Sequence, residues 1–386
     1  MKQLNPLTGL RGVAAYAVLL AHGICSSFNY GGEILFQAFA QRIAYFGMSL
    51  FFVLSGFVIH YNYAKLIKTE GFLKGGYKFI VARIARLYPL YGLAILFTLD
   101  KIPSAHFHNQ GLGVLAFLTM TQSWFNLQML TFQPAWSIST EWFFYFTFII
   151  TLPLFEKIRR PLITMVAFLI ASFLLLPCLL QFQIDTYRNT NGWVAYFSPF
   201  TRIFDFVAGV LASKTYLALH KDDNRKISLL GYGALLVLLG FCILIIAFDP
   251  LSKTQYGILL PNFVFTPFIA PLLFLFCRYD TFLSRVLCAK PFTFIGEISY
   301  SVYLLGFLVM TALGDIYVSK DASVIAYINS SFKIVVIFTF TTFMAYGCYN
   351  LFEKPMRTWV RQVLTLKSKR KEIFEAIPET VGYELK

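Results

Sequence analysis

Apolar runs of about 20 residues recur along almost the whole chain and limit what it can fold into, because a helix needs about that length to cross the ~30 Å hydrocarbon core of a bilayer. The runs that reach or approach this length are 12–28, 43–63, 84–99, 135–155, 162–182, 197–217, 228–248, 257–277, 292–313 and 331–352. Hydrophobic residues make up 58% of the sequence and charged residues only 13%, which excludes an ordinary soluble domain. The sequence predicts an all-α, polytopic membrane helix bundle with about ten transmembrane helices.

One further apolar stretch, 111–124, is so short that its length alone does not show whether it crosses the membrane. Loop charges decide the question, because Lys and Arg gather on the cytoplasmic side of a membrane protein. If 111–124 does not cross, most of the 33 Lys and Arg residues face the cytoplasm together with both termini. If it does cross, that bias largely disappears. We therefore expect a short re-entrant or interfacial segment at 111–124.

The net charge of +14 would suggest a nucleic-acid partner in a soluble chain. In a membrane protein, basic loops beside the anionic cytoplasmic leaflet explain it better, so we expect membrane lipid and no nucleic acid as a partner. The apolar runs end near residue 352. We therefore expect two regions, a membrane domain at 1–353 and a basic cytoplasmic tail at 354–386.

Arg11 lies at the start of the first apolar run, and His22 lies within it. An ionisable side chain is costly there unless it faces a cavity, a partner or a substrate. Eleven residues at ~100° each return to nearly the same helix face, and ~1.5 Å per residue places His22 roughly 16 Å deeper than Arg11. Ala15 and Val18 lie between them on that face and leave room for a thin substrate. This face is therefore a candidate functional site.

Arg83 and Arg86 stand at the expected start of the third span and project from one helical face. Two guanidinium groups beside the free backbone N–H groups of a helix start are suited to binding phosphate. The alternative is that both are anchors at the inner membrane boundary. Because Arg11 is expected at the same depth, the phosphate clamp is the favoured interpretation.

Two carboxylates also lie inside apolar runs. Glu141 comes about one and a half turns into the fourth run, from the outer side, and either has a functional role or satisfies Ser and Thr groups in the bundle. Asp205 lies one turn after Arg202, and we interpret these two as a structural ion pair.

No metal site is predicted. His106 and His108 have no carboxylate or cysteine near them in the sequence, so we expect an outer-loop surface there. The six cysteines are scattered without a CxxC pair, and most lie in or beside apolar runs, which is typical of small hydrophobic residues.

Taken in order, the motifs resemble the successive signatures of acyltransferase family 3, the integral membrane O-acyltransferases. These motifs are LTGLRG at 7–12, followed by His22; FFVLSGF at 51–57; RxxR at 83–86; WSISTE at 136–141; GEISYSVYL at 296–304; and FEKP at 352–355. Each motif alone is weak, but six in the right order extend over most of the chain.

The resemblance implies a multi-pass protein of the bacterial inner (plasma) membrane with both termini in the cytoplasm. It implies a cytoplasmic acyl-CoA donor, usually acetyl-CoA, and a hydroxyl acceptor on a cell-envelope glycan, such as lipopolysaccharide, or on a lipid-linked saccharide. It also implies that His22 is the essential catalytic residue, with Arg11 as its companion. The chain departs from the family pattern at Gly306, where many members have a histidine.

Residues and resemblance together predict O-acyl transfer. Arg11, Arg83 and Arg86 would bind the CoA phosphates at the inner face, and the pantetheine arm would extend along the first helix toward His22. The imidazole would act as a general base on the acceptor hydroxyl or form a transient acyl-histidine, and the sequence leaves both open. Glu141 would orient the imidazole or hydrogen-bond the acceptor.

A proton-coupled transporter or flippase of a lipid-linked glycan is the alternative function. Arg11, His22 and Glu141 would then form a proton relay across the bundle. The RxxR pair argues against this alternative, because a CoA clamp needs cations at the cytoplasmic face and a proton relay does not.

Overall fold

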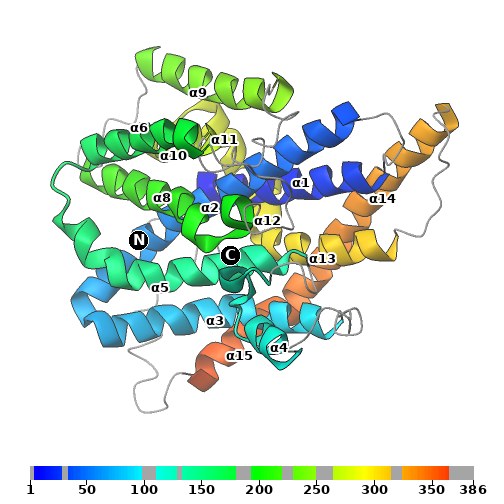
Figure 1. Ribbon diagram of the computed structural model, residues 1–386, viewed down its shortest axis with the longest axis horizontal. Coiled ribbons are helices and arrows are strands. Elements are labelled where there is room, and N and C mark those ends of the chain that lie inside the picture. The colour runs from blue at the N-terminus through cyan, green and yellow to red at the C-terminus, as the bar shows by residue number, and fades with distance from the viewer. Residues whose placement is uncertain are drawn as a thin grey trace.

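The computed structural model describes residues 4–27, 34–97, 110–127, 133–179, 193–219, 229–248, 264–313 and 324–364, and these residues form a bundle of helices (Figure 1). The elements are α1 (Asn5–Ser27), α2 (Ile34–Glu70), α3 (Phe72–Leu96), α4 (Gln110–Leu118), the 3₁₀ turn η3 (Gln122–Phe125), α5 (Ala135–Lys157), α6 (Pro161–Leu179), the π-helical turn η4 (Trp193–Phe197), α8 (Pro199–Leu219), α9 (Leu229–Phe248), α10 (Thr266–Arg278), α11 (Phe282–Cys288), α12 (Lys290–Glu297), α13 (Ser299–Ala312), α14 (Val324–Cys348), the π-helical turn η8 (Tyr349–Glu353) and α15 (Lys354–Leu364). These ranges contain no strand, which confirms the all-α class.

Within the described ranges, six helical stretches are long and apolar enough to cross a membrane: Asn5–Ser27, Gln37–Glu70, Phe72–Leu96, Ala135–Lys157, Trp193–Leu219 and Asn329–Leu364. α12 and α13 qualify together as a further span, bent by 64° at the break between them. Shorter apolar helices of 10–17 residues lie within α6, α9 and α10. The chain is therefore a multi-pass membrane protein, whereas the count of about ten spans stays a prediction.

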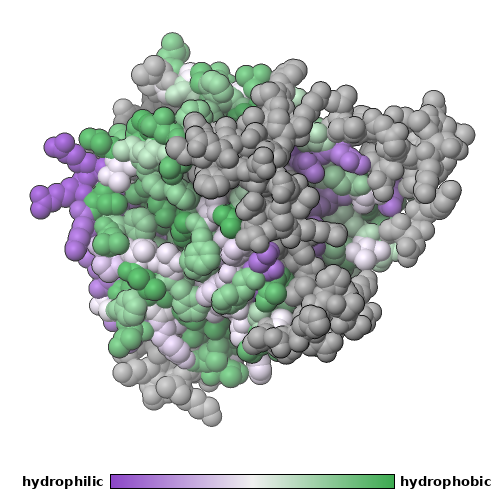
Figure 2. Space-filling view, in the orientation of Figure 1, coloured by the Kyte–Doolittle hydropathy of each residue, from purple (hydrophilic) through white to green (hydrophobic). Residues whose placement is uncertain are grey.

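Large apolar side chains cover the outside of this bundle. On α6 and α9, for example, Ile163 is 59% exposed and Leu236 is 64% exposed. Figure 2 shows hydrophobic residues over much of the coloured face, with hydrophilic residues gathered at the left edge, where α5 leads into α6 in Figure 1. An exterior dominated by apolar side chains suits a protein that lipid surrounds.

Ion pairs join the C-terminal parts of α2, α5 and α8. Glu156 of α5 lies 3.0 Å from Lys68 Nζ of α2 and 4.0 Å from Lys214 Nζ of α8. The basic segments that follow these helices in the sequence therefore begin at one end of the bundle, as the loop charges require. That this end faces the cytoplasm stays a prediction.

The two central helices α2 and α8 cross with their backbones in contact. A Cβ atom on Gly56 would run into the carbonyl oxygen of Phe206, and a Cβ atom on Gly209 would run into the carbonyl oxygen of Val53. Small residues permit such close approach between membrane helices. This crossing fixes the position of Ser55, which lines the candidate site described below.

The first helix, α1, also packs closely against its neighbours, through the glycines on either side of Arg11. A Cβ atom on Gly9 would run into the carbonyl oxygen of Leu287 in α11, and one on Gly12 would lie 2.8 Å from the backbone nitrogen of Gly296 in α12. The LTGLRG motif therefore lets α1 lie against α11 and α12. This contact sets the side of the helix to which Arg11 points.

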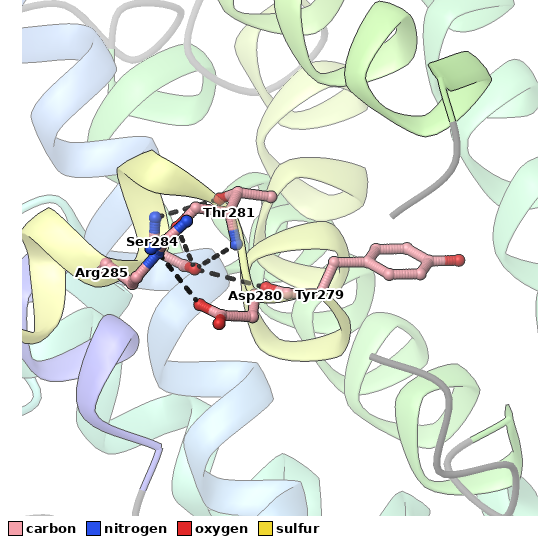
Figure 3. Close-up of polar contacts among 5 residues, drawn as sticks. All are labelled: Tyr279, Asp280, Thr281, Ser284 and Arg285. Atoms are coloured by element: carbon pink, nitrogen blue, oxygen red, sulfur yellow. Dashed lines mark hydrogen bonds and ion pairs between the residues drawn. The ribbon is translucent and has the colours of Figure 1, made fainter. Parts of the chain in front are cut away.

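The short helix α11 that supports α1 begins with a capping box. Ser284 N donates to Thr281 Oγ1 at 3.0 Å, and Thr281 N donates to Ser284 Oγ at 2.8 Å (Figure 3). Asp280 and Arg285 add an exposed ion pair of 3.5 Å. Reciprocal bonds of this kind satisfy two backbone donors at a helix start and so fix where α11 begins.

The third span begins earlier than the sequence predicts. α3 starts at Phe72 and not near residue 84, because polar first turns lower the hydropathy without ending the helix. One of these polar side chains, Lys78, is buried and paired with Glu70 at 2.5 Å. Arg83 and Arg86 therefore lie roughly three and four turns inside α3. The expectation that they stand at a helix start beside free N–H groups is wrong.

The stretch 111–124 forms the nine-residue helix α4 and the turn η3. At ~1.5 Å per residue α4 is roughly 14 Å long, which is too short to cross a bilayer. η3 is joined to α5, since Ser123 Oγ donates to Ser139 Oγ at 2.8 Å and Trp124 Nε1 donates to the Ser139 carbonyl at 2.9 Å. Its re-entrant or interfacial placement stays a prediction.

The last long helix, α14, continues through the π-helical turn η8 into α15. The boundary expected between residues 353 and 354 therefore falls inside a continuous helical run that ends at Leu364. π-helical turns within helices frequently occur at functional sites. Here the turn contains Glu353, whose side chain is 4% exposed. Residues 365–386 of the predicted tail lie outside the described residues.

Candidate active site

Four charged side chains from three helices line one cavity. Arg11 comes from α1, Arg83 and Arg86 from α3, and Glu141 from α5; the cavity volume is about 80 Å³. We call this cavity the arginine pocket. Three cations and one carboxylate in its lining give it a net positive charge, which favours an anionic ligand.

Arg83 is fixed in this pocket by aromatic side chains. It is 2% exposed, and its Nη2 donates a 2.6 Å hydrogen bond to the hydroxyl of Tyr63. The guanidinium carbon lies 4.8 Å from the ring centroid of Tyr63 and 5.8 Å from those of Phe79 and Tyr145. Cation–π contacts in a desolvated site stabilise such an arrangement, so Arg83 holds one orientation.

Glu141 lies on the same cationic wall. Its Oε1 accepts a 2.7 Å hydrogen bond from Ser55 Oγ of α2, and it also hydrogen-bonds Tyr145 one turn further along α5. The carboxylate attracts the guanidinium of Arg83. Glu141 therefore links α2, α3 and α5 around the pocket.

His22 lines a second and larger cavity of about 370 Å³, which we call the histidine chamber. Ala15 and Val18, the small residues between Arg11 and His22, are part of its wall. The side chains of α13 and of the turn η4 close other sides. None of the lining residues that the structure describes is Asp, Glu, Lys or Arg, so charge is concentrated in the arginine pocket and is low in this chamber.

The two cavities adjoin at Met48 and Tyr303, which line both. The hydroxyl of Tyr303 lies 2.7 Å from Ser137 Oγ and donates a 3.2 Å hydrogen bond to the Pro134 carbonyl. These bonds tie α13 to the start of α5 at the junction. A ligand that extends from the arginines to the imidazole would pass these side chains.

The structure brings four of the five predicted site residues together and places the fifth, His22, in the adjoining cavity. Arg11, Arg83 and Arg86 line one pocket, as their expected depth implied. Glu141 lies with them and is not among the described lining residues of the histidine chamber. Its two predicted roles, orienting the imidazole or hydrogen-bonding the acceptor, stay predictions. Depth along a helix was predictable, but the lateral packing that decides which cavity a side chain faces was not.

Gly306, the departure from the family pattern, lines the histidine chamber. A Cβ atom there would lie 2.7 Å from Cδ1 of Leu19. A side chain at this position would therefore share the space beside His22, and its absence enlarges the chamber.

The predicted ion pair of Arg202 and Asp205 is present and fully buried. Arg202 Nη1 lies 3.3 Å from Asp205 Oδ2, and Thr266 donates a hydrogen bond to the same carboxylate. Neither charged residue is among the lining residues of the two cavities. The pair is therefore a structural contact within α8, and the hydrogen bond from Thr266 joins it to α10. His106 and His108 lie outside the described residues.

Three residues of the site received no role from the sequence: Ser55, Tyr303 and Glu353. Ser55 and Tyr303 fall within the FFVLSGF and GEISYSVYL motifs, but they are uncharged and so carry no chemical signal that separates them from other polar residues in apolar runs. Glu353 could have been found, because it is a carboxylate beside an apolar run, the same signal that drew attention to Glu141. Glu353 accepts a 2.6 Å hydrogen bond from Ser301 of α13, the helix that also contributes Tyr303 to the arginine pocket.

Comparison with known proteins shows to which family the chain is similar. A family model described as an acyltransferase domain matches residues 5–361. The O-acetyltransferase OatA of Staphylococcus aureus strain MRSA252 is 23% identical over 397 residues, which covers 95% of this chain and 60% of OatA. The acyltransferase MdmB of Streptomyces mycarofaciens is 28% identical over 229 residues, covering 54% of this chain and 56% of MdmB. No solved structure is significantly similar to the chain.

The chain therefore spans only part of the length of these relatives. The family match runs from the start of α1 into α15 and includes every helix that contributes to the two cavities. On that match, the chain belongs to acyltransferase family 3.

Proposed function

We propose that this protein is a membrane O-acyltransferase that transfers an acyl group, in the simplest case acetyl, from cytoplasmic acyl-CoA to a hydroxyl group of a cell-envelope glycan or lipid-linked saccharide. The observation that carries the proposal is the junction of a cationic pocket with a histidine-lined chamber at Met48 and Tyr303. A polyanionic donor and a neutral hydroxyl need different surroundings, and the two cavities offer both.

The arginine pocket suits the phosphate groups of the donor. Guanidinium groups bind phosphate through charge-assisted hydrogen bonds that are often bidentate. The helix rise of roughly 16 Å from Arg11 to His22 is of the order of an extended pantetheine arm. With its phosphates beside Arg11 and Arg86, acyl-CoA would direct its thioester past Tyr303 into the histidine chamber.

The chemistry in the chamber is a proton transfer coupled to acyl transfer. Neutral His22 accepts the proton of the acceptor hydroxyl as the oxygen attacks the thioester carbonyl carbon. The C–S bond then breaks, the CoA thiolate leaves, and the imidazolium returns the proton to the sulfur. A positioned general base typically contributes ~10²–10⁴-fold to the rate. The apolar lining limits access of water, which would otherwise compete as the acceptor.

The same geometry weakens the transporter alternative. A relay of Arg11, His22 and Glu141 would need the carboxylate near the imidazole, but the two side chains line different cavities. The names of the relatives OatA and MdmB, an O-acetyltransferase and an acyltransferase, also support acyl transfer.

A reconstitution assay tests the proposal. The purified full-length protein in lipid nanodiscs is mixed with acetyl-CoA carrying a ¹⁴C-labelled acetyl group and with glycan extracted from the envelope of the source cells. We expect release of free CoA and base-labile label on the glycan, and mass spectrometry of envelope glycans should show one added acyl mass only in cells that carry the gene. Movement of an unmodified saccharide across vesicles, without CoA release, would instead support the flippase.

A further inference from the structure

Glu353 is a buried carboxylate that is not among the lining residues of either cavity. It is 4% exposed and ends the π-helical turn η8, where α14 passes into α15. Its Oε2 accepts a 2.6 Å hydrogen bond from Ser301 Oγ of α13, and Ser301 is itself fully buried. A carboxylate buried in a membrane bundle is costly unless it is hydrogen-bonded and paired with cations.

The cations around Glu353 come from three helices. Its carboxylate attracts Arg86 of α3, Arg357 of α15 and Arg11 of α1. Arg11 and Arg86 also line the arginine pocket. Ser301 lies on α13, the helix that also contributes Ser299, Tyr300 and Tyr303 to the lining of the pocket. Two of the three arginines of that pocket are therefore attracted by a carboxylate that does not itself line the cavity.

We infer that Glu353 is a positioning residue, which holds the guanidinium groups of Arg11 and Arg86 in the orientation that binds the donor phosphates. The inference rests on the proposed acyl-CoA donor. It assigns to the FEKP motif a role that its sequence alone does not reveal.

Electrostatics explains why the pocket needs such a residue. Arg11, Arg83 and Arg86 carry like charges around a cavity of about 80 Å³, and like charges this close repel one another. Glu141 attracts Arg83, and Glu353 attracts the other two. Without Glu353, Arg11 and Arg86 would spread over more rotamers, and a ligand would have to order them when it binds.

A competing explanation predicts the opposite sign. If Glu353 only neutralised the arginines, removing its charge would raise the positive potential of the pocket and tighten the binding of an anion. The direction of the change in acetyl-CoA affinity therefore separates positioning from neutralisation.

The test measures acetyl-CoA binding to the full-length protein in nanodiscs by isothermal titration calorimetry. Glu353→Gln keeps the side-chain volume and an acceptor for Ser301 but removes the charge. We expect acetyl-CoA to bind roughly tenfold more weakly, the size of one weakened charge-assisted contact. In the transfer assay KM for acetyl-CoA should rise while kcat at saturating donor stays near the wild-type value. Glu353→Asp retains the charge and should give an intermediate affinity.

Glu156→Gln is the matched control. Glu156 also pairs with two cations, Lys68 and Lys214, but at the end of the bundle and away from the residues that line the pocket. Its acetyl-CoA affinity should equal that of the wild type. Ser301→Ala provides a second test that leaves the charge in place. It removes the hydrogen bond that fixes Glu353 and should weaken binding in the same direction.

Unchanged or tighter acetyl-CoA binding by Glu353→Gln would overturn the positioning role and leave the donor assignment intact. The same result from Ser301→Ala would overturn it if Glu353→Gln does not fold. An equal loss of affinity in Glu156→Gln would also overturn it, because the effect would then not depend on a carboxylate that attracts the arginines of the pocket. Failure of the wild-type protein to bind acetyl-CoA would refute the proposed donor and this inference with it.

Discussion

The hydroxyl of Ser55 on α2 donates a 2.7 Å hydrogen bond to Oε1 of Glu141 on α5. Both residues line the arginine pocket, and the bond joins helices that are far apart in the sequence. Because Glu141 also attracts Arg83, the contact couples the packing of α2 and α5 to the position of a guanidinium group. This carboxylate orders the cationic wall and does not face His22.

Ser55→Ala should therefore destabilise the protein. A hydrogen bond to a charged group contributes about 1.5–3 kcal/mol, and its loss leaves a carboxylate oxygen without that donor. We expect the free energy of unfolding to fall by about that amount, read from denaturant unfolding in detergent. Ser172→Ala is the control, because Ser172 donates to the neutral carbonyl of Phe168 within its own helix, α6. Equal losses in the two variants would mean that the bond to Glu141 has no special weight.

The placement of Glu141 shows where sequence reasoning reaches its limit. A carboxylate in an apolar run signals a functional or polar interior site, and the helical rise gives its depth. Both inferences needed only local sequence. Its lateral position depends on how α2, α3 and α5 pack, and on the glycine contacts that set the crossing of α2 with α8. These contacts join residues too distant in sequence for a single chain to reveal.

The two arginines of the RxxR motif should respond differently to substitution. Arg86→Ala should weaken acetyl-CoA binding by roughly 10–100-fold, the value of one charge-assisted contact, with little loss of stability. Arg83→Ala should weaken binding and also destabilise the fold, because it empties a site enclosed by Tyr63, Phe79 and Tyr145.

Lysine should rescue position 86 in part but position 83 hardly at all. A lysine supplies a point charge, whereas the contact of Arg83 with Tyr63 uses a planar guanidinium group that also stacks on the ring. Calorimetry with acetyl-CoA and thermal unfolding, measured on the same samples, separate the two effects. If the double alanine variant bound donor as tightly as wild type, both arginines would be membrane anchors only.

The glycine contact between α2 and α8 gives a prediction about folding. Gly209→Ala places a methyl group against the Val53 carbonyl, so the helices must separate. Overpacking of this kind costs roughly 1–3 kcal/mol and should lower the midpoint of thermal unfolding. Gly240→Ala on α9 is the control, because no atom lies within 4 Å of the new Cβ there. The thermal stability of that variant should be unchanged or slightly higher, because alanine has a higher helix propensity than glycine.

The start of α3 and the role of Glu353 illustrate two further limits. A hydropathy run begins where the sequence becomes apolar, but α3 begins at Phe72, because Lys78 is paired with Glu70 and a buried charge with a partner does not end a helix. Glu353 carried a visible signal as a carboxylate beside an apolar run. Its partner Ser301 lies on another helix, so its effect on Arg11 and Arg86 could only be seen in three dimensions.

Topology can be tested at the connection between α5 and α6. The ion pairs of Glu156 with Lys68 and Lys214 join the ends of α2, α5 and α8, so residues 157–160 should be accessible from the cytoplasm with the basic segments beside them. A single cysteine at Arg159, in a variant without native cysteines, should react with a membrane-impermeant maleimide only after the cells are opened. Labelling in intact cells would reverse the predicted orientation.

The decisive residue for the proposed reaction is His22. His22→Ala should reduce acyl transfer by at least ~10²-fold, because a general base contributes ~10²–10⁴-fold to the rate. Acetyl-CoA should still bind, since His22 lines the chamber and the arginines line a separate pocket. Unchanged donor binding together with lost transfer would distinguish a chemical role from misfolding.

His22→Gln is the sharper variant, because glutamine fills similar space and forms hydrogen bonds but cannot accept a proton near neutral pH. If the imidazole acts as a base or carries the acyl group, this variant should be as inactive as His22→Ala. Acid quenching during turnover should trap labelled protein only if an acyl-histidine forms. Transfer retained by His22→Gln would show that His22 only orients substrate. The base would then have to be another group, and Glu141, across the junction at Tyr303, would be tested next.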